Sequence, residues 1–398
     1  QHVYDSARTI QNEGLYPEYL GFKLFQMDNY TDTLMLFEAA SADELPPLQA
    51  MMTNTAYNVD NFETLADDLA WYIEKDWSTG AQRTDAPALE PFSYARYWHG
   101  YLIWLRPLLL LMPYTGVRIV QYIVLFSLLA VVLVQLRRRC GLRAAVWFAV
   151  SQLAVSVWFV PHQVQYFTCF MIAYAGCAWV LAKPRRSDVL CLGLLVLGTA
   201  TAFCDLLVTP IITLGLPLTC WLLEPQQRLR GGVPQCALAV GGSLCWGTGY
   251  ALCWAGKWAL AGAVTDNNVL ADALHQAEVR TTADTWHGME LTWRNIFIFL
   301  YDTLNSHHLF WPALAVLAVL IALFILSIRS KTALVRALPL ALTTCMTPAW
   351  FVLLRTHSIQ HGWFTWRALG LTVFAGLAFL YYACDLRAAR RRLQKGSI

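Results

Sequence analysis

Two carboxylates four positions apart are the residues of this sequence best suited to chemistry. Asp28 and Asp32 lie in residues 26–32 (QMDNYTD). In a helix, residues four apart share one face, so both acids would point the same way. A carboxylate held beside a substrate hydroxyl can act as a general base. The competing interpretation is structural, because Asp is also common at helix caps and in turns.

The elements that must position these acids belong to a membrane protein. The chain has 398 residues, of which 57% are hydrophobic and 14% charged, and its mean hydropathy is +0.43. These values predict an all-α polytopic membrane protein. The net charge of +3 is unevenly spread, since residues 1–98 hold 16 acidic and 5 basic side chains and residues 99–398 hold 10 and 24. We expect membrane lipids as neighbours and no nucleic acid partner.

The domain organisation follows from the same pattern. Residues 1–98 form a polar, helical N-terminal segment, and residues 99–114 an interfacial helix interrupted by Arg106 and Pro107. Residues 115–386 form the transmembrane domain, with a long loop over 263–308, and residues 387–398 form a basic tail. The 11 cysteines lie between Cys140 and Cys384 without a CxxC pair, which favours buried apolar residues over disulfides.

Nine apolar segments are predicted to span the bilayer. They are 115–136, 143–160, 165–182, 188–206, 208–223, 234–262, 309–328, 334–353 and 365–383.

The loops between these segments alternate in charge. Every second loop belongs to a basic set. Together with the C-terminal tail, this set holds 17 basic and three acidic residues. The positive-inside rule places that set in the cytoplasm, so residues 1–98 are expected to be extracytoplasmic and the C-terminus cytoplasmic. Export of residues 1–98 requires a further transmembrane helix, which we expect upstream of Gln1.

Four cations are predicted near the outer ends of the spans, namely Arg106, Lys257, Arg294 and Arg367. Together they could form a pocket for a lipid phosphate, because arginine binds phosphate oxygens in a bidentate fork. Snorkelling to the interface is the alternative for Arg106 and Arg367, and an ion pair with Asp205 is the alternative for Lys257.

Histidines raise the question of a metal. His357 and His361 have i, i+4 spacing, but no HExxH pattern surrounds them, and Gly362 makes one helix through both less favourable. Ordinary interfacial histidines are favoured, with no metal site. Walker, GxGxxG and GxSxG motifs are missing from the sequence, so nothing in it points to a nucleotide donor.

In layout the chain resembles the GT-C class of integral membrane glycosyltransferases. The likeness rests on the acidic stretch 26–32 and on four further stretches: 94–106, the 203–210 hairpin, 254–258 and 357–367. In that class a first transmembrane helix precedes a large extracytoplasmic loop, and an Asp of the loop acts as base or positions the acceptor. The donor is a polyprenyl-phosphate sugar.

The resemblance implies inverting transfer of a hexose or pentose at a bacterial plasma (inner) membrane, in biosynthesis of a cell-envelope glycan. The acceptor would be an extracytoplasmic glycan, lipid or protein. Asp28 would be the base, with Asp5 and Asp32 as alternatives, and Mg²⁺ or Mn²⁺ beside Asp28 is left open. The cations would bind the leaving lipid phosphate. The polar residues expected in the acceptor and sugar pocket are Asn29, His99, His162, Gln163, Asp205, Trp258, His357 and His361.

Two other functions are weighed against the transferase. A transporter or lipid flippase would also need polar groups in the membrane, but no internal repeat is evident and the polar residues gather at the outer face. A non-catalytic assembly protein would use residues 1–98 for docking and would tolerate neutralisation of the outer cations one at a time.

Overall fold

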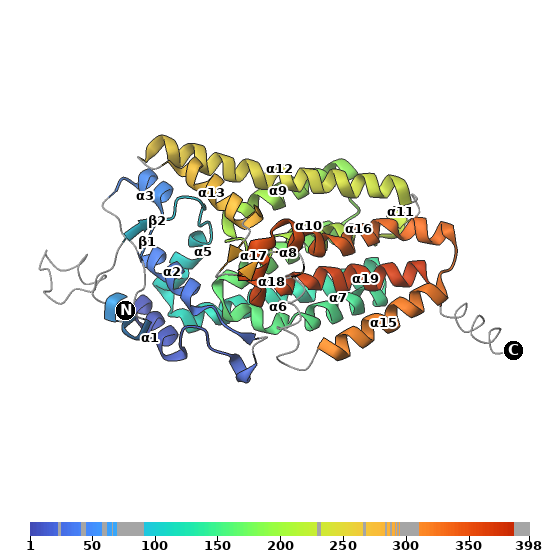
Figure 1. Cartoon of the computed structure of the whole chain (residues 1–398), viewed down its shortest axis with the longest axis horizontal. Helices are drawn as coiled ribbons and strands as arrows, with labels where there is room; N and C mark the ends of the chain where they lie inside the picture. Colours follow the sequence, from blue (N-terminus) through green and yellow to red (C-terminus); the bar gives the residue numbers. More distant parts are fainter. Residues whose placement is uncertain are drawn as a thin grey trace, which may run out of the picture.

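A computed structural model describes most of the chain, as an elongated, almost entirely helical molecule (Figure 1). The described residues are 1–22, 25–40, 45–57, 62–65, 67–69, 91–228, 232–265, 268–282, 285–286, 289–290, 292, 294 and 310–385. Short N-terminal elements gather at one end, and long helices run from there to the other end.

The N-terminal group contains short helices and one pair of strands. Its elements are α1 (His2–Glu13), η1 (Tyr19–Gly21), α2 (Asn29–Ala40), α3 (Pro47–Thr53), β1 (Thr55–Tyr57), η3 (Phe62–Thr64), β2 (Pro91–Ser93) and α5 (Leu102–Leu111). Helix α1 ends at Gly14, whose φ of 93 is a backbone angle that favours glycine. The antiparallel pair of β1 with β2 was not predicted.

The remaining elements form the bundle and its connections. They are α6 (Tyr114–Arg139), α7 (Leu142–Ala154), η4 (Val157–His162), α8 (Val164–Ala182), α9 (Ser187–Cys204), α10 (Ile211–Leu222), α11 (Pro225–Arg228), α12 (Gly232–Val264), α13 (Val269–Thr282), β3 (Thr285–Trp286), β4 (Met289–Glu290), α15 (Phe310–Ser327), α16 (Lys331–Leu353), α17 (Arg355–Gln360), α18 (Gly362–Thr365), η5 (Trp366–Ala368) and α19 (Leu369–Ala383).

Seven helical segments in the described part of the chain are long and apolar enough to cross a membrane. They coincide with seven of the nine predicted spans, so the all-α polytopic prediction is confirmed. The other two predicted spans contain the shorter helices α7 and α10. The segment predicted over 143–160 is broken because Ser156 adopts a left-handed conformation (φ 55) between α7 and η4, and Pro161 follows within η4. The segment predicted over 208–223 starts late because α10 begins only after Pro210.

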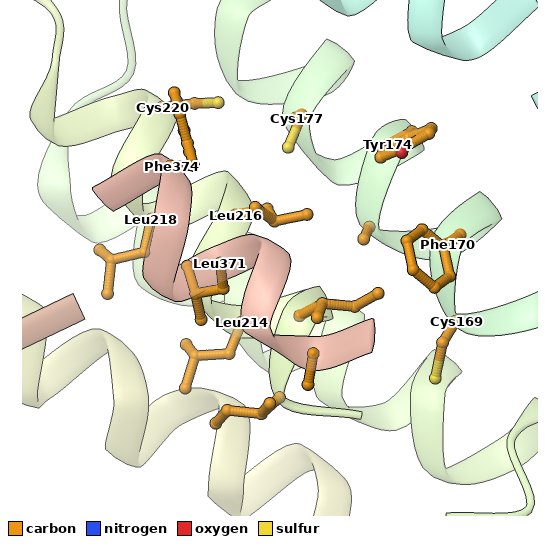
Figure 2. Close-up of a cluster of buried hydrophobic side chains, with 14 of the residues drawn as sticks. Cys169, Phe170, Tyr174, Cys177, Leu214, Leu216, Leu218, Cys220, Leu371 and Phe374 are labelled. Atoms are coloured by element: carbon orange, nitrogen blue, oxygen red, sulfur yellow. The ribbon is translucent and has the colours of Figure 1, made fainter. Parts of the chain in front are cut away.

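The core of the bundle surrounds α10, whose twelve residues are all buried. Figure 2 shows Leu214 and Leu216 of α10 close to side chains of α8 and α19. Gly215 allows the close approach of α19, because a Cβ there would lie 2.0 Å from a Leu371 methyl carbon. All 11 cysteines are free, as expected, and several of them are buried in this core.

The N-terminal group is docked onto the bundle by polar contacts as well as apolar packing. Ser6 Oγ accepts a hydrogen bond from the Tyr114 amide over 2.8 Å, at the start of α6. Glu13 pairs with Arg118 on the same helix. These contacts hold α1 against the start of α6.

Candidate functional site

Asp28 is the N-cap of α2. Its Oδ1 accepts from the Thr31 amide over 3.0 Å and its Oδ2 from the Thr31 hydroxyl over 2.7 Å. Its own amide donates to Oε1 of Gln163 over 2.9 Å. Burial raises the pKa of Asp28, and the two hydrogen bonds from Thr31 oppose that shift. Both carboxylate oxygens are therefore engaged within the protein.

Asp32 caps a different helix. Its carboxylate accepts from the amides of Val164 (3.2 Å) and Gln165 (3.4 Å) at the start of α8, and from the Tyr114 hydroxyl. The first amides of a helix have no partner within the helix and attract negative charge. Burial raises the pKa of Asp32 well above its usual value, while the Val164 amide and Arg118 oppose the shift.

Three further predicted residues join this acid cluster, which consists of Asp28, Asn29, Asp32, His162 and Gln163. Gln163 donates to Asn29 Oδ1 over 3.0 Å, and Asn29 donates to the Gly14 carbonyl over 2.8 Å. The His162 carbonyl accepts from Arg118, and burial lowers the pKa of its imidazole to about 4. These five predicted residues therefore lie close together, and the hydrogen bonds of Asp32 and Gln163 join α2 to the start of α8.

A different acid of α2, Glu38, faces a cavity. Its Oε2 accepts from the Tyr101 hydroxyl and lies 2.7 Å from Nδ1 of His99. The other ring nitrogen of His99 lies 3.1 Å from the Tyr94 carbonyl. The remaining oxygen of Glu38, Oε1, is buried and has no hydrogen-bond partner among the described residues.

The cavity beside Glu38 has a volume of about 550 Å³ and lies where the N-terminal group meets the membrane helices. Its wall is part polar and part apolar, and it is lined by Glu38, Leu45, Pro47, Ala50, Met51, Asn54, Thr55, Trp98, His99, Gly100, Leu102, Ile103, Arg106 and Phe203. His99 holds a left-handed backbone (φ 53), which for a residue other than glycine costs about 1–3 kcal/mol and is often found at functional sites. We call this the Glu38 cavity.

The four predicted cations do not share this cavity. Arg106 lines it, and its guanidinium donates to the Glu38 carbonyl over 2.9 Å. Lys257 is buried just behind its wall, where it donates to the carbonyls of Met51 and Met52 (2.8 and 3.1 Å) rather than pairing with Asp205.

The other two cations lie elsewhere. Arg367 stacks against Tyr166, 4.8 Å from its guanidinium carbon to the ring centre, and Tyr166 in turn contacts the Gln26 carbonyl beside the acid cluster. Arg294 is exposed and is not among the residues that line the Glu38 cavity. The prediction that the four cations form one phosphate pocket was therefore wrong, and only Arg106 lines the Glu38 cavity.

Of the remaining predicted residues, Trp258 lines a smaller aromatic cavity of about 130 Å³, together with residues such as Arg280 and Leu207. His357 Nε2 lies 2.8 Å from the Leu207 carbonyl. Asp205 Oδ2 accepts from the Val208 amide over 3.0 Å, and burial raises the pKa of Asp205 to about 7.

The rings of His357 and His361 lie close together. The His361 amide donates to the His357 carbonyl in a helical turn, and the ring centres are 4.8 Å apart. α17 ends at Gln360, before His361, and α18 begins at Gly362, so no single α-helix runs through both histidines. Within the described residues, no group of three or more His, Cys, Asp or Glu side chains is arranged to hold a metal ion.

Sequence reasoning missed Glu38 and its partner Tyr101. One signal was available, since Glu38 is the single acid in residues 33–40 (TLMLFEAA), an otherwise largely apolar helical run. An acid in such a run is expected to be buried, and a buried carboxylate needs partners. Comparisons of the chain with models of protein families, with curated proteins and with solved structures find no match.

Proposed function

We propose that the protein is a membrane glycosyltransferase of the GT-C type, and that Glu38 is its general base. One observation carries the proposal: a buried carboxylate is held by Tyr101 and His99 through one oxygen, while its other oxygen has no partner among the described residues, at the wall of a cavity of about 550 Å³. Such an oxygen can receive a proton from a bound hydroxyl. Asp28 is less suited, because Thr31 occupies both of its oxygens.

The reaction would be an inverting displacement. Glu38 Oε1 takes the proton of the acceptor hydroxyl as its oxygen bonds to the anomeric carbon of the sugar. The bond from that carbon to the polyprenyl phosphate breaks, and the phosphate leaves with the bonding electrons. Arg106 lines the same cavity and would stabilise the growing negative charge. His99 and Tyr101 orient the base.

The apolar part of the wall suits a lipid-linked donor. Leu102 and Ile103 of α5 line the cavity, and Ile103 is 68% exposed. Further along the same short helix, Leu110 and Leu111 are also exposed, at 81% and 72%. This apolar face would meet the bilayer, so an isoprenoid chain could lie along α5 with its phosphate near Arg106.

The test compares two isosteric variants, Glu38→Gln and Asp28→Asn. Purified protein in proteoliposomes is supplied with labelled polyprenyl-phosphate hexoses and pentoses together with an extract of envelope glycans and lipids, and transfer is followed by loss of label from the donor. We expect Glu38→Gln to lower the rate by roughly 100- to 10,000-fold, the usual contribution of a general base. Asp28→Asn should remain active, because Asn caps helices about as well as Asp.

The control is thermal unfolding, which should be similar for both variants and the wild type. Full activity in Glu38→Gln would exclude Glu38, and loss of activity only in Asp28→Asn would return the base to Asp28. Saturable uptake of labelled substrate into vesicles without sugar transfer would favour a transporter instead.

A further inference from the structure

A second polar cavity lies at the opposite end of the bundle from α1–α3. It has a volume of about 320 Å³ and is formed by the end of α10, by α11, by the starts of α12 and α16, and by the end of α19 (Figure 1). These elements meet closely, since a Cβ on Gly232 would lie 1.6 Å from the Val335 carbonyl oxygen. The walls come from five elements, so the cavity belongs to the packed bundle. We call it the basic-end cavity.

Three arginines and no acidic side chain line this cavity among the described residues, namely Arg228, Arg329 and Arg336. Arg228 is oriented by Tyr382, which accepts from its Nη1 over 2.5 Å and stacks against its guanidinium at 4.8 Å. Its buried Nε has no partner in the described part of the chain. Arg336 is exposed, lines the cavity and has no hydrogen-bond or ion-pair partner among the same residues. Uncompensated guanidinium groups in one cavity point to an anion.

The first turn of α16 adds to the positive potential. Ser330 caps this helix by accepting from the Ala333 amide over 3.1 Å, and Ser330 and Thr332 both line the cavity. A helix start attracts anionic groups through its free amides and its dipole. Phosphate oxygens accept hydrogen bonds from donors of these kinds, namely guanidinium groups, hydroxyls and helix amides.

A buried glutamine adds a hydrogen-bond acceptor that lacks a donor. Gln235 is 3% exposed, and its Nε2 donates to both oxygens of Gln227, over 2.9 and 3.2 Å. These two acceptors fix the orientation of the amide, because the flipped form would face oxygen with oxygen. Its Oε1 is then a buried acceptor without a donor among the described residues, on a side chain that belongs to the cavity lining. A buried acceptor without a donor is unfavourable, so a ligand that supplies an O–H group fits here.

We propose that the basic-end cavity binds a phosphodiester that bears a free hydroxyl, of the phosphoglycerol type. The arginines and the start of α16 hold the phosphate, and Gln235 accepts from the hydroxyl. The group could be the headgroup of an anionic membrane lipid or a soluble phosphoglycerol compound. The location at a bundle end, with apolar Leu222 and Leu340 in the lining, suits a lipid whose chains lie along the helices.

The experiment uses the whole protein in detergent and native mass spectrometry with added lipids. The probes are phosphatidylglycerol, phosphatidylmethanol (the same charge without the hydroxyl), phosphatidylcholine and soluble glycerophosphoglycerol. We expect phosphatidylglycerol to bind at least several-fold more tightly than phosphatidylmethanol. Arg336→Gln should weaken phosphatidylglycerol by about tenfold, as for loss of a charge-assisted hydrogen bond. Gln235→Leu should remove the preference over phosphatidylmethanol.

Arg138→Gln is the matched control, because Arg138 is an exposed arginine in the last turn of α6 that does not line the cavity. Its lipid binding should equal that of the wild type. Tight binding of glycerophosphoglycerol that Arg336→Gln abolishes would support the soluble form of the ligand. Equal binding of all four probes, or equal loss in Arg138→Gln and Arg336→Gln, would overturn the proposal.

Discussion

The two ends of helix α2 place buried acids in opposite circumstances. At its start, Asp28 and Asp32 use their carboxylate oxygens to satisfy amides and hydroxyls of α2, α6 and α8. Near its end, Glu38 keeps one buried oxygen without a partner among the described residues and lines a cavity. Burial is common to all three acids, so burial alone does not indicate function.

The difference lies in how many oxygens of each carboxylate already have hydrogen-bond partners within the protein. A carboxylate whose partners are all backbone amides and internal hydroxyls stabilises the fold, and a substrate would have to displace those partners. A carboxylate held through one oxygen is both positioned and available. The start of α2 thus anchors this helix to α8, whereas its end carries the candidate reactive group. The following predictions test this difference.

The largest effect on folding is expected for Asp32→Ala. This change leaves the first amides of α8 and the Tyr114 hydroxyl without their acceptor in a buried site, which should destabilise the protein by about 2–4 kcal/mol. The measurement is thermal unfolding in detergent, together with the yield of monodisperse protein. Asp32→Asn keeps one acceptor oxygen and serves as the control with a smaller loss. If Asp32→Ala unfolds at the wild-type temperature, the anchor interpretation fails.

A pH dependence is expected from Asp205, whose folded-state pKa is raised by burial from 3.8 to about 7. Between these values the folded state binds more protons than the unfolded state, so stability falls as pH rises. Compared with Asp205→Asn, the wild type should lose about 1 kcal/mol per pH unit between pH 5 and pH 7. Unfolding curves of both proteins at pH 5 and pH 7 measure the difference in their free energies of unfolding. The titration of His162 and His361 is common to both proteins and cancels in this difference. A constant difference would show that Asp205 is ionised throughout.

The sequence predicted the helical elements far better than it predicted partners. Long apolar runs locate helices because the length and hydropathy of a segment are local properties of the chain. The break at Ser156 was missed because a left-handed backbone is uncommon for residues other than glycine, so a serine within an apolar run does not predict one. The pair of β1 with β2 joins residues far apart in the chain.

The site was predicted in part for the same reason. Asp28 and Asp32, which are near in sequence, both lie beside the start of α8. Which acid keeps an open oxygen depends on contacts from distant segments, such as Tyr101 with Glu38. The four cations were grouped by their expected depth in the membrane, but depth does not specify lateral position, and Lys257 and Arg367 have different neighbours.

The smallest effect is expected at Asp28 and distinguishes capping from catalysis. Asp28→Ala removes the acceptor for the Thr31 amide and should destabilise the protein by about 1 kcal/mol, the usual value for an N-cap, whereas Asp28→Asn should cost only a few tenths. Urea or thermal unfolding of the two variants measures this difference. If Asn and Ala are equally destabilising, the negative charge of Asp28 matters more than its cap. The contrast between the two ends of α2 would then rest on Glu38 alone.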